Sequence, residues 1–187
     1  MPQPRKIVVI GPESTGKSTL SAALAKALNT VWNPEYARSY LDAIGRPYTE
    51  ADLLQIAYGQ IEGEAQRLAS AQDYLICDTD LYVLKVWAEA KYARCDRRIL
   101  ELIAGNTYDL YLLTYIDTPW MDDPQREHPA IEERRYFYHQ YRDIVQQSGV
   151  PWIDIRGGEE ERLAQALAGI RQFVNSPIRQ CHISPKP

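Results

Sequence analysis

The stretch GPESTGKS, residues 11–18, decides the fold of this chain. Two glycines, Gly11 and Gly16, frame four residues and are followed directly by Lys17 and Ser18, which is the phosphate-loop pattern. Glycine permits positive backbone dihedral angles, so such a loop can turn its backbone N–H groups toward an anion. The pattern therefore predicts a loop that binds the phosphates of a nucleoside triphosphate.

The residues around this loop support the same interpretation. A short β-branched run, residues 7–10, precedes it and an amphipathic helical pattern follows it, which is the strand–loop–helix setting of a phosphate loop. A glycine-rich turn that ends in Lys-Ser by chance would not need this setting. Lys17 is expected to reach the β- and γ-phosphates, and Ser18 to ligate Mg²⁺. The expected nucleotide contacts are Gly11, Glu13, Ser14, Thr15, Gly16, Lys17, Ser18 and Thr19.

Composition limits the class of protein. A chain of 187 residues with 45% hydrophobic content is expected to form one globular domain with a sizeable core. The net charge of −4 argues against a general nucleic-acid or membrane surface, so the expected partner is a small molecule. The absence of a long apolar stretch at the N-terminus predicts a cytoplasmic protein, and the oligomeric state stays open. Three cysteines without paired or zinc-site spacing are expected to be reduced thiols: Cys77, Cys95 and Cys181.

Apolar runs alternate along the chain with helical patterns. This alternation predicts an α/β fold in which a five-stranded parallel sheet lies between two layers of helices. The predicted strands are residues 6–10, 30–33, 74–78, 109–116 and 151–155. The predicted helices follow Lys17 and Tyr36 and span residues 50–70, 81–92, 96–104, 131–147 and 160–175. Residues 1–175 are expected to form the domain, and the proline-containing segment 176–187 a poorly ordered tail.

Ligands of an open parallel sheet gather at the carboxyl ends of its strands, which directs attention to the residues that follow each strand. After the second predicted strand, Pro34 interrupts the chain, and Glu35 and Arg38 stand three residues apart. If the following residues are helical, both side chains face the crevice opposite the phosphate loop. The alternative is an acidic residue at a helix N-terminus with an ion pair on the surface.

The third predicted strand ends in Asp78, as in the second nucleotide motif of phosphate-loop proteins, where a carboxylate orients Mg²⁺ or its waters. Asp80, two residues later, is a second candidate carboxylate. It could bond a substrate hydroxyl, or it could be the N-cap of the helix that begins at Leu81, or both.

Residues 118–135 follow the fourth predicted strand and combine prolines, paired aspartates and arginines, which is typical of a lid. Phosphoryl transfer requires cations over the γ-phosphate, and Arg126, Arg134 and Arg135 could supply them when the lid closes. Arg134 and Arg135 point about 100° apart on a helix, so they cannot both face the site. The alternative is a solvated charged loop.

Aromatic usage favours amphipathic rings, with 13 Tyr and 4 Trp against 2 Phe. Such rings suit a pocket that stacks on a heteroaromatic ring, although they also suit the edge of any core. The residues near predicted strand ends are the better stacking candidates: Trp32, Tyr36, Tyr82 and Trp120, rather than Trp87 or Trp152.

Taken together, the segments GPESTGKS, EYAR, DTD and WMDDPQR resemble the ribosylnicotinamide kinase domain of NadR-type NAD biosynthesis proteins over roughly residues 6–175. The resemblance implies ATP-dependent phosphorylation of nicotinamide riboside at its 5′-hydroxyl, with Mg²⁺. It also implies a fold similar to nucleoside monophosphate kinases, with strand order 2-3-1-4-5. Because the chain begins at the first kinase strand, it implies a stand-alone kinase. Pro124 stands where that family is expected to carry glycine.

Within this interpretation, each singled-out residue has an expected role. Lys17 and Arg126, with Arg134 or Arg135, would act on the transferring phosphoryl group, and Ser18 with Asp78 would hold the metal. Glu35 is the first choice for the carboxylate on the acceptor side and Asp80 the second. Gly157 would pass over the adenine. The expected substrate contacts are Glu35, Tyr36, Arg38, Asp80, Tyr82 and Trp120.

Two other functions remain open at this point. One is a kinase for another nucleoside. The other is an ATP-binding regulatory or sensor module with little turnover, which would not need Glu35, Arg38 and Asp80 around a pocket.

Overall fold

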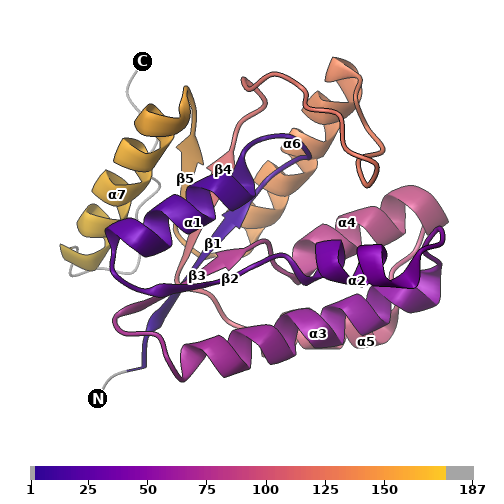
Figure 1. The fold of residues 1–187 in the computed structure, drawn as a ribbon, viewed down its shortest axis with the longest axis horizontal. Helices are drawn as coiled ribbons and strands as arrows, with labels where there is room; N and C mark the ends of the chain where they lie inside the picture. The colour runs from indigo at the N-terminus through magenta and orange to yellow at the C-terminus, as the bar shows by residue number, and fades with distance from the viewer. Residues whose placement is uncertain (1–2, 176–187) are drawn as a thin grey trace.

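The computed structural model describes residues 3–175, and it contains one sheet of five parallel strands in the order β2-β3-β1-β4-β5 (Figure 1). The strands are β1 (Arg5–Ile10), β2 (Val31–Asn33), β3 (Tyr74–Asp78), β4 (Leu110–Thr114) and β5 (Trp152–Ile155). The predicted fold class and strand order are therefore confirmed. The expected tail, residues 176–187 with Cys181, lies outside the described residues.

The central strand β1 is fully buried from Ile7 to Ile10, because helices cover both of its faces. It pairs with β3 on one side and β4 on the other, with Val9 opposite Asp78 and Ile7 opposite Leu110. A strand buried on both faces must be apolar at successive positions, which is why the run at the start of the chain does not alternate. The phosphate loop leaves the carboxyl end of this strand.

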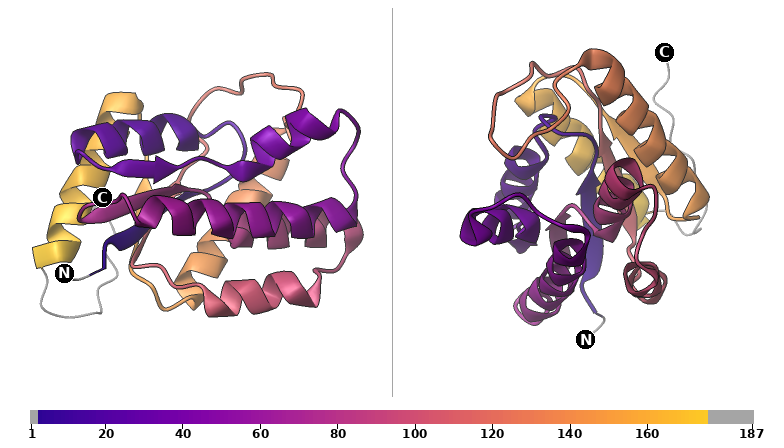
Figure 2. Two further views of the ribbon diagram at one scale, coloured as in Figure 1. Left: turned by 60° about the horizontal axis from the view of Figure 1, so that its bottom comes forward. Right: turned by 90° about the vertical axis from the view of Figure 1, so that its right-hand side faces the viewer.

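Seven helices follow or separate the strands in the part of the chain that the structure describes. They are α1 (Lys17–Ala27), α2 (Tyr36–Ile44), α3 (Glu50–Leu68), α4 (Leu81–Tyr92), α5 (Arg97–Gly105), α6 (Ile131–Gln147) and α7 (Glu159–Asn175). Helices α1 and α7 pack on one face of the sheet, and α4 and α6 on the other. Helices α2, α3, α4 and α5 share a third apolar cluster. Figure 2 shows these helices grouped beside the sheet.

The predicted elements match these bounds closely. Strand β3 and helices α4 and α6 have the predicted limits, while the strand predicted for residues 109–116 is shorter at both ends. Residues 118–130 of the predicted lid form a loop with one short turn, and residues 131–135 begin α6. Among residues 3–175, the structure contains no helix that is both long enough and apolar enough to cross a bilayer.

Candidate active site

The phosphate loop packs closely against the end of β4. Gly11 has a φ of 149°, and a Cβ atom built on it would lie 2.4 Å from the Thr114 hydroxyl oxygen. Only glycine therefore allows this close approach of the loop to β4. The Thr15 hydroxyl bonds the Pro12 carbonyl at 2.8 Å and lies 2.7 Å from the Thr114 hydroxyl. Gly16, with a φ of 72°, precedes α1, so the N-terminus of this helix lies at the loop as the sequence predicts.

Lys17, the first residue of α1, turns back over the loop and donates a hydrogen bond to the Pro12 carbonyl at 2.7 Å. Burial lowers the pKa of Lys17, and the negative charges of Glu35 and Asp78 partly offset that effect. The ammonium group of this half-buried lysine thus lies near the Glu35 and Asp78 carboxylates. A phosphate entering this site would meet more than one cation, because the side chains of Arg38 and Arg126 lie around the same space as Lys17.

A central cavity of about 290 Å³ joins the phosphate loop to the residues predicted on the acceptor side. Glu35 immediately precedes α2 and lies in this cavity with Arg38, whose Nε is 3.8 Å from Glu35 Oε2. Burial raises the pKa of Glu35, and the nearby Lys17 charge opposes the rise. The cavity is lined by Gly11, residues 13–19, Glu35, Ala37, Arg38, Val83, Trp87, Gln125, Arg126 and Tyr141.

Asp78 ends β3 and is 1% exposed. Its Oδ1 has no hydrogen-bond partner in the described structure, while the Ser18 hydroxyl bonds the same carboxylate. Burial raises the pKa of Asp78. The residues present fit Mg²⁺, because an unpaired buried carboxylate oxygen beside a hydroxyl is a hard-cation donor set that phosphate oxygens and waters would complete. Within residues 3–175 there is no cluster of three acidic, His or Cys residues that could hold a metal alone.

The loop after β4 contacts the phosphate loop directly. Glu13 Oε2 accepts hydrogen bonds from the backbone amides of Glu127 at 3.0 Å and His128 at 3.1 Å. The Ser14 hydroxyl accepts one from the Met121 amide at 2.8 Å, and the Thr118 hydroxyl donates to the Ser14 carbonyl at 2.7 Å. Two residues predicted to contact nucleotide therefore also hold the predicted lid in place.

The three lid arginines are placed differently. Arg126 lines the central cavity, donates to the Met121 carbonyl, and has its NH1 atom 3.4 Å from the Ser14 hydroxyl. Arg134, on α6, is 5% exposed and donates to the Ser14 carbonyl at 3.2 Å. Arg135 is exposed. The structure thus selects Arg134 over Arg135 as the α6 arginine beside the phosphate loop.

Asp80 and Tyr82 are not brought to the phosphate loop. Asp80 is the N-cap of α4: its Oδ1 accepts from the Tyr82 amide at 3.0 Å, and its Oδ2 accepts from the Tyr111 hydroxyl at 2.8 Å. Both residues line a separate cavity of about 450 Å³ that extends to the loop before β4. Thr79 adopts a left-handed φ of 69°, so the chain turns Asp80 away from the edge where Asp78 lies. The helix-cap alternative is therefore what the structure shows for Asp80.

The expected stacking residues are only partly near the site. Tyr36 and Trp32 line a neighbouring cavity of about 680 Å³, the α2–α3 cavity, together with Ser18, Glu35, Arg38 and Asp78. Trp120 instead lies within the lid, and the centre of its ring is 5.9 Å from Arg126 Cζ and 5.8 Å from Arg134 Cζ.

Trp87 and Tyr141, which sequence reasoning did not select, line the central cavity instead. Trp87 stands four residues after Val83 on one face of α4, and Val83 lines the same cavity. That helical spacing was the signal that could have identified it.

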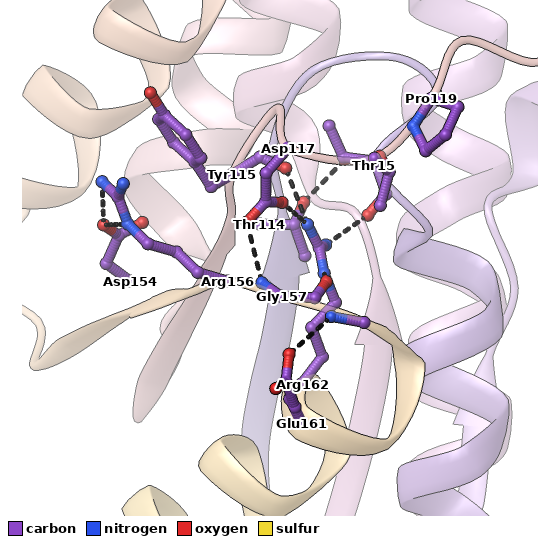
Figure 3. A network of polar contacts seen from close by, with 12 residues as sticks. Thr15, Thr114, Tyr115, Asp117, Pro119, Asp154, Arg156, Gly157, Glu161 and Arg162 are labelled. Carbon is purple, nitrogen blue, oxygen red and sulfur yellow. Dashed lines mark hydrogen bonds and ion pairs between the residues drawn. The ribbon is translucent and has the colours of Figure 1, made fainter.

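On the opposite side of the phosphate loop, the α7-side cavity of about 660 Å³ is lined by residues that include Ser14, Pro119, Gly158 and Leu163. Gly157, predicted to pass over a base, has a φ of 91° and donates its amide to Asp117 Oδ2 at 2.7 Å. No residue lines both this cavity and the α2–α3 cavity, but the central cavity shares residues with each. Sequence reasoning also missed Arg162, a buried residue of α7 that contacts Thr15 and Gly157 (Figure 3).

Comparison with known proteins gives consistent results. Residues 6–162 match the protein family described as an AAA domain. The trifunctional NAD biosynthesis/regulator protein NadR of Escherichia coli strain K12 is 26% identical over 177 residues, which cover 91% of this chain and 43% of the relative. The chain thus spans about two fifths of the length of the curated relatives it matches.

Solved structures show the same fold. NadR structures in complex with NR and with NAD and AMP-PNP are 22% and 21% identical, each with a TM-score of 0.77. The similarity covers 96% and 95% of this chain and 54% and 52% of those chains. Thymidylate kinase from Ehrlichia chaffeensis is 17% identical with a TM-score of 0.63, covering 90% of this chain and all of that one (100%).

The resemblance to NadR-type proteins that the motifs predict is confirmed by these relatives. Since the family match extends from β1 into α7, over far more than half of the residues, the chain belongs to the AAA domain family.

Proposed function

We propose that this chain is an ATP-dependent nucleoside kinase that transfers the γ-phosphoryl group to the 5′-hydroxyl of nicotinamide riboside. The observation that carries this proposal is that Lys17 and Glu35 line one cavity, which shares residues with a further cavity on either side of it. A nucleotide needs one of these spaces for its base and an acceptor needs the other.

The relatives support the proposal in two ways. The Escherichia coli relative is a NAD biosynthesis protein, and similar structures hold NR or AMP-PNP. The fold is shared with a thymidylate kinase, so phosphoryl transfer to a nucleoside or nucleotide is the broader activity that this architecture supports.

In the proposed reaction, the phosphates lie on the backbone donors of the phosphate loop and against Lys17. Arg126 and Arg134 lie beside Ser14 of this loop and are the proposed cations for the transferring phosphoryl group. Phosphoryl transfer is accelerated mainly by positioning and by such fixed charges.

Glu35 is the proposed general base on the acceptor side. The acceptor oxygen forms a bond to the γ-phosphorus while the bond from that phosphorus to the β–γ bridging oxygen breaks, and the bridging oxygen keeps the electron pair and leaves with ADP. The proton of the acceptor hydroxyl passes to the Glu35 carboxylate. Burial raises the pKa of Glu35, which makes this carboxylate a stronger base than an exposed glutamate.

Ser18 and Asp78 are the proposed residues for Mg²⁺. If bound there, the ion would supply positive charge that offsets the negative charge of the phosphates. The α2–α3 cavity, which includes Tyr36, is the proposed space for the base of the acceptor, and Arg38 lies at its boundary with the central cavity. Aromatic faces attract a cationic ring such as nicotinamide riboside carries.

The decisive experiment is a substrate panel. The protein is incubated with Mg-ATP and nicotinamide riboside, its 2′-deoxy analogue, uridine or cytidine, and kcat/KM is measured from product masses. Nicotinamide riboside should give the highest kcat/KM, and loss of a bonded hydroxyl should lower it strongly. If a pyrimidine riboside gives the highest value, the protein is a kinase for another nucleoside. If ATP binds but no nucleoside is phosphorylated, the kinase proposal fails and a sensor function is favoured.

Two variants connect the activity to this site. Lys17→Ala should abolish transfer while the protein stays folded, whereas Lys26→Ala, on the exposed end of the same helix, should leave transfer unchanged. Glu35→Gln should lower kcat by about 10²- to 10⁴-fold. A Lys17→Ala variant with normal turnover would contradict the assignment of the phosphate loop.

A further inference from the structure

Arg162 is a charged residue enclosed at the junction of three loops. It lies in the first turn of α7 and is only 3% exposed. Burying a guanidinium is costly unless its charge is paired and its N–H groups are bonded. The groups that bond this buried guanidinium therefore indicate which parts of the fold it holds together.

The guanidinium bonds a carbonyl from each of three segments (Figure 3). NH1 donates to Thr15 of the phosphate loop at 2.6 Å, Nε to Gly157 after β5 at 2.7 Å, and NH2 to Tyr115 after β4 at 2.9 Å. A guanidinium is planar and its donors are fixed relative to one another. The three carbonyls are thereby held at set positions around one rigid group.

Asp117 completes this arrangement. One of its oxygens contacts Arg162 NH2, and the other accepts the Gly157 amide at 2.7 Å. Asp117 thus neutralises the buried cation and holds the same Gly157 whose carbonyl Arg162 bonds. The segment after β5 is therefore held through both the N–H and the C=O of Gly157.

We propose that Arg162 is a positioning residue that fixes the Gly157 segment relative to the phosphate loop and so presets the nucleotide half of the site. Ser14, Gly158 and Arg162 itself line the α7-side cavity, where a nucleotide base would reach from the loop. A ligand with two linked parts binds most tightly when the two subsites are already held at the right separation. This inference rests on the proposed use of a nucleoside triphosphate.

A neighbouring arginine provides a matched control. Arg156 lies in the same segment, pairs with Asp154 at 2.7 Å and covers the Tyr115 ring at 3.7 Å. Its side chain is 48% exposed and, within residues 3–175, makes no hydrogen bond to the phosphate loop. Removing it deletes an arginine of the same region without touching the connection to Thr15.

The test measures binding by calorimetry without any acceptor, using AMP-PNP and inorganic tripolyphosphate as probes. Arg162→Gln should weaken AMP-PNP binding about tenfold or more. Tripolyphosphate binding should weaken less, because that probe occupies only the phosphate loop. Arg156→Gln should leave both affinities within about twofold, and Arg162→Lys, which keeps the charge but not the fork, should resemble Arg162→Gln.

Asp117→Asn keeps the size of the side chain and serves if Arg162→Gln fails to fold. It should weaken AMP-PNP binding in the same direction by a smaller factor, and in a folded double variant the two losses should not be additive. A folded Arg162→Gln protein that binds AMP-PNP like the wild type would overturn the proposal. Equal losses for AMP-PNP and tripolyphosphate would overturn it as well.

These outcomes are separate from those of the kinase proposal. A wild-type protein that binds AMP-PNP but phosphorylates no nucleoside contradicts the kinase and leaves the role of Arg162 standing. A wild-type protein that binds no AMP-PNP contradicts both.

Discussion

Arg38 donates a hydrogen bond to the Asp123 carboxylate over 2.8 Å and so joins α2 to the loop after β4. The Arg38 side chain is 43% exposed, and exposed ion pairs contribute about 0–1 kcal/mol to stability. Arg38 also lines both the central and the α2–α3 cavities. The pair therefore connects the lid to the proposed acceptor space more than it stabilises the fold.

Asp123→Asn should reveal this connection. We expect the free energy of unfolding to change by less than about 1 kcal/mol, while KM for the acceptor rises by about three- to tenfold. Glu89→Gln removes the Lys85–Glu89 pair on α4 and serves as the control. Neither Lys85 nor Glu89 lines the central, α2–α3 or α7-side cavity, so this variant should change neither quantity appreciably. An unchanged acceptor KM in Asp123→Asn would mean that the pair has no part in acceptor binding.

Arg126→Ala is expected to act on the transition state. Because Arg126 lies at the phosphate loop, we expect kcat to fall by about 10³-fold or more with a smaller change in ATP affinity. Arg135→Ala, which removes an exposed arginine of α6, is the control and should keep normal kcat. If Arg126→Ala weakens ATP binding at constant kcat, Arg126 is a docking residue.

The acid limb of the pH–rate profile should report the ionisation of the Glu35 carboxyl. Burial holds the pKa of Glu35 above its ordinary value near 4.5, and a base must be deprotonated to act. Activity should therefore fall as the pH drops through that raised pKa, and Glu35→Gln should lose this limb along with most of its activity. The profile of kcat/KM between pH 5 and 9 measures this, and an unchanged acid limb in Glu35→Gln would assign the limb to another group.

Asp80 should affect stability in the opposite direction from an ordinary paired carboxylate. Burial raises its pKa from 3.8 to about 7, so the folded state favours the neutral form. The stabilisation that the neutral Asp80 carboxyl adds to the free energy of unfolding is fully present below about pH 3.8 and is lost as the pH rises through 7. Between pH 5 and 8, the wild type should lose roughly 1–4 kcal/mol of unfolding free energy relative to Asp80→Asn.

Asp96 provides the control for this measurement. It caps α5 in the same manner, but hydrogen bonds from Arg98 hold its pKa at about 2. Its contribution is lost only as the pH falls toward that value, so Asp96→Asn should show no change in pH dependence between pH 5 and 8. Urea unfolding of the wild type, Asp80→Asn and Asp96→Asn at pH 5 and pH 8 tests this. An equal change in the free energy of unfolding for wild type and Asp80→Asn between the two pH values would refute the Asp80 prediction.

The parts of the molecule that sequence predicted are those set by local rules. The phosphate loop depends on glycines within one short stretch, and Glu35 follows directly from the end of β2. Asp80 shows where local reasoning ended: it follows a strand as expected, but the left-handed φ of Thr79 redirects it toward Tyr111. A single residue's dihedral angle is not encoded in a strand-end rule.

The buried position of Arg162 could not be predicted from the sequence for a different reason. Its bond to Thr15 spans 147 positions of the chain, and nothing in its neighbourhood in sequence indicates burial of a charge. Helical spacing from Val83 places Trp87 on the same face of α4, but which face of α4 meets the central cavity depends on how α4 packs against the sheet and against α3. Such contacts arise when elements meet, after each element has been specified.

The central cavity shares residues with a separate space on each side, and these two outer spaces share none. Two ligands could therefore approach Lys17 from opposite directions without crossing each other's path. A single compound with adenosine at one end, a second nucleoside at the other and a chain of phosphates between them would follow one continuous channel. For such a bisubstrate compound, the number of phosphates that gives the tightest binding would report the distance between the two outer spaces.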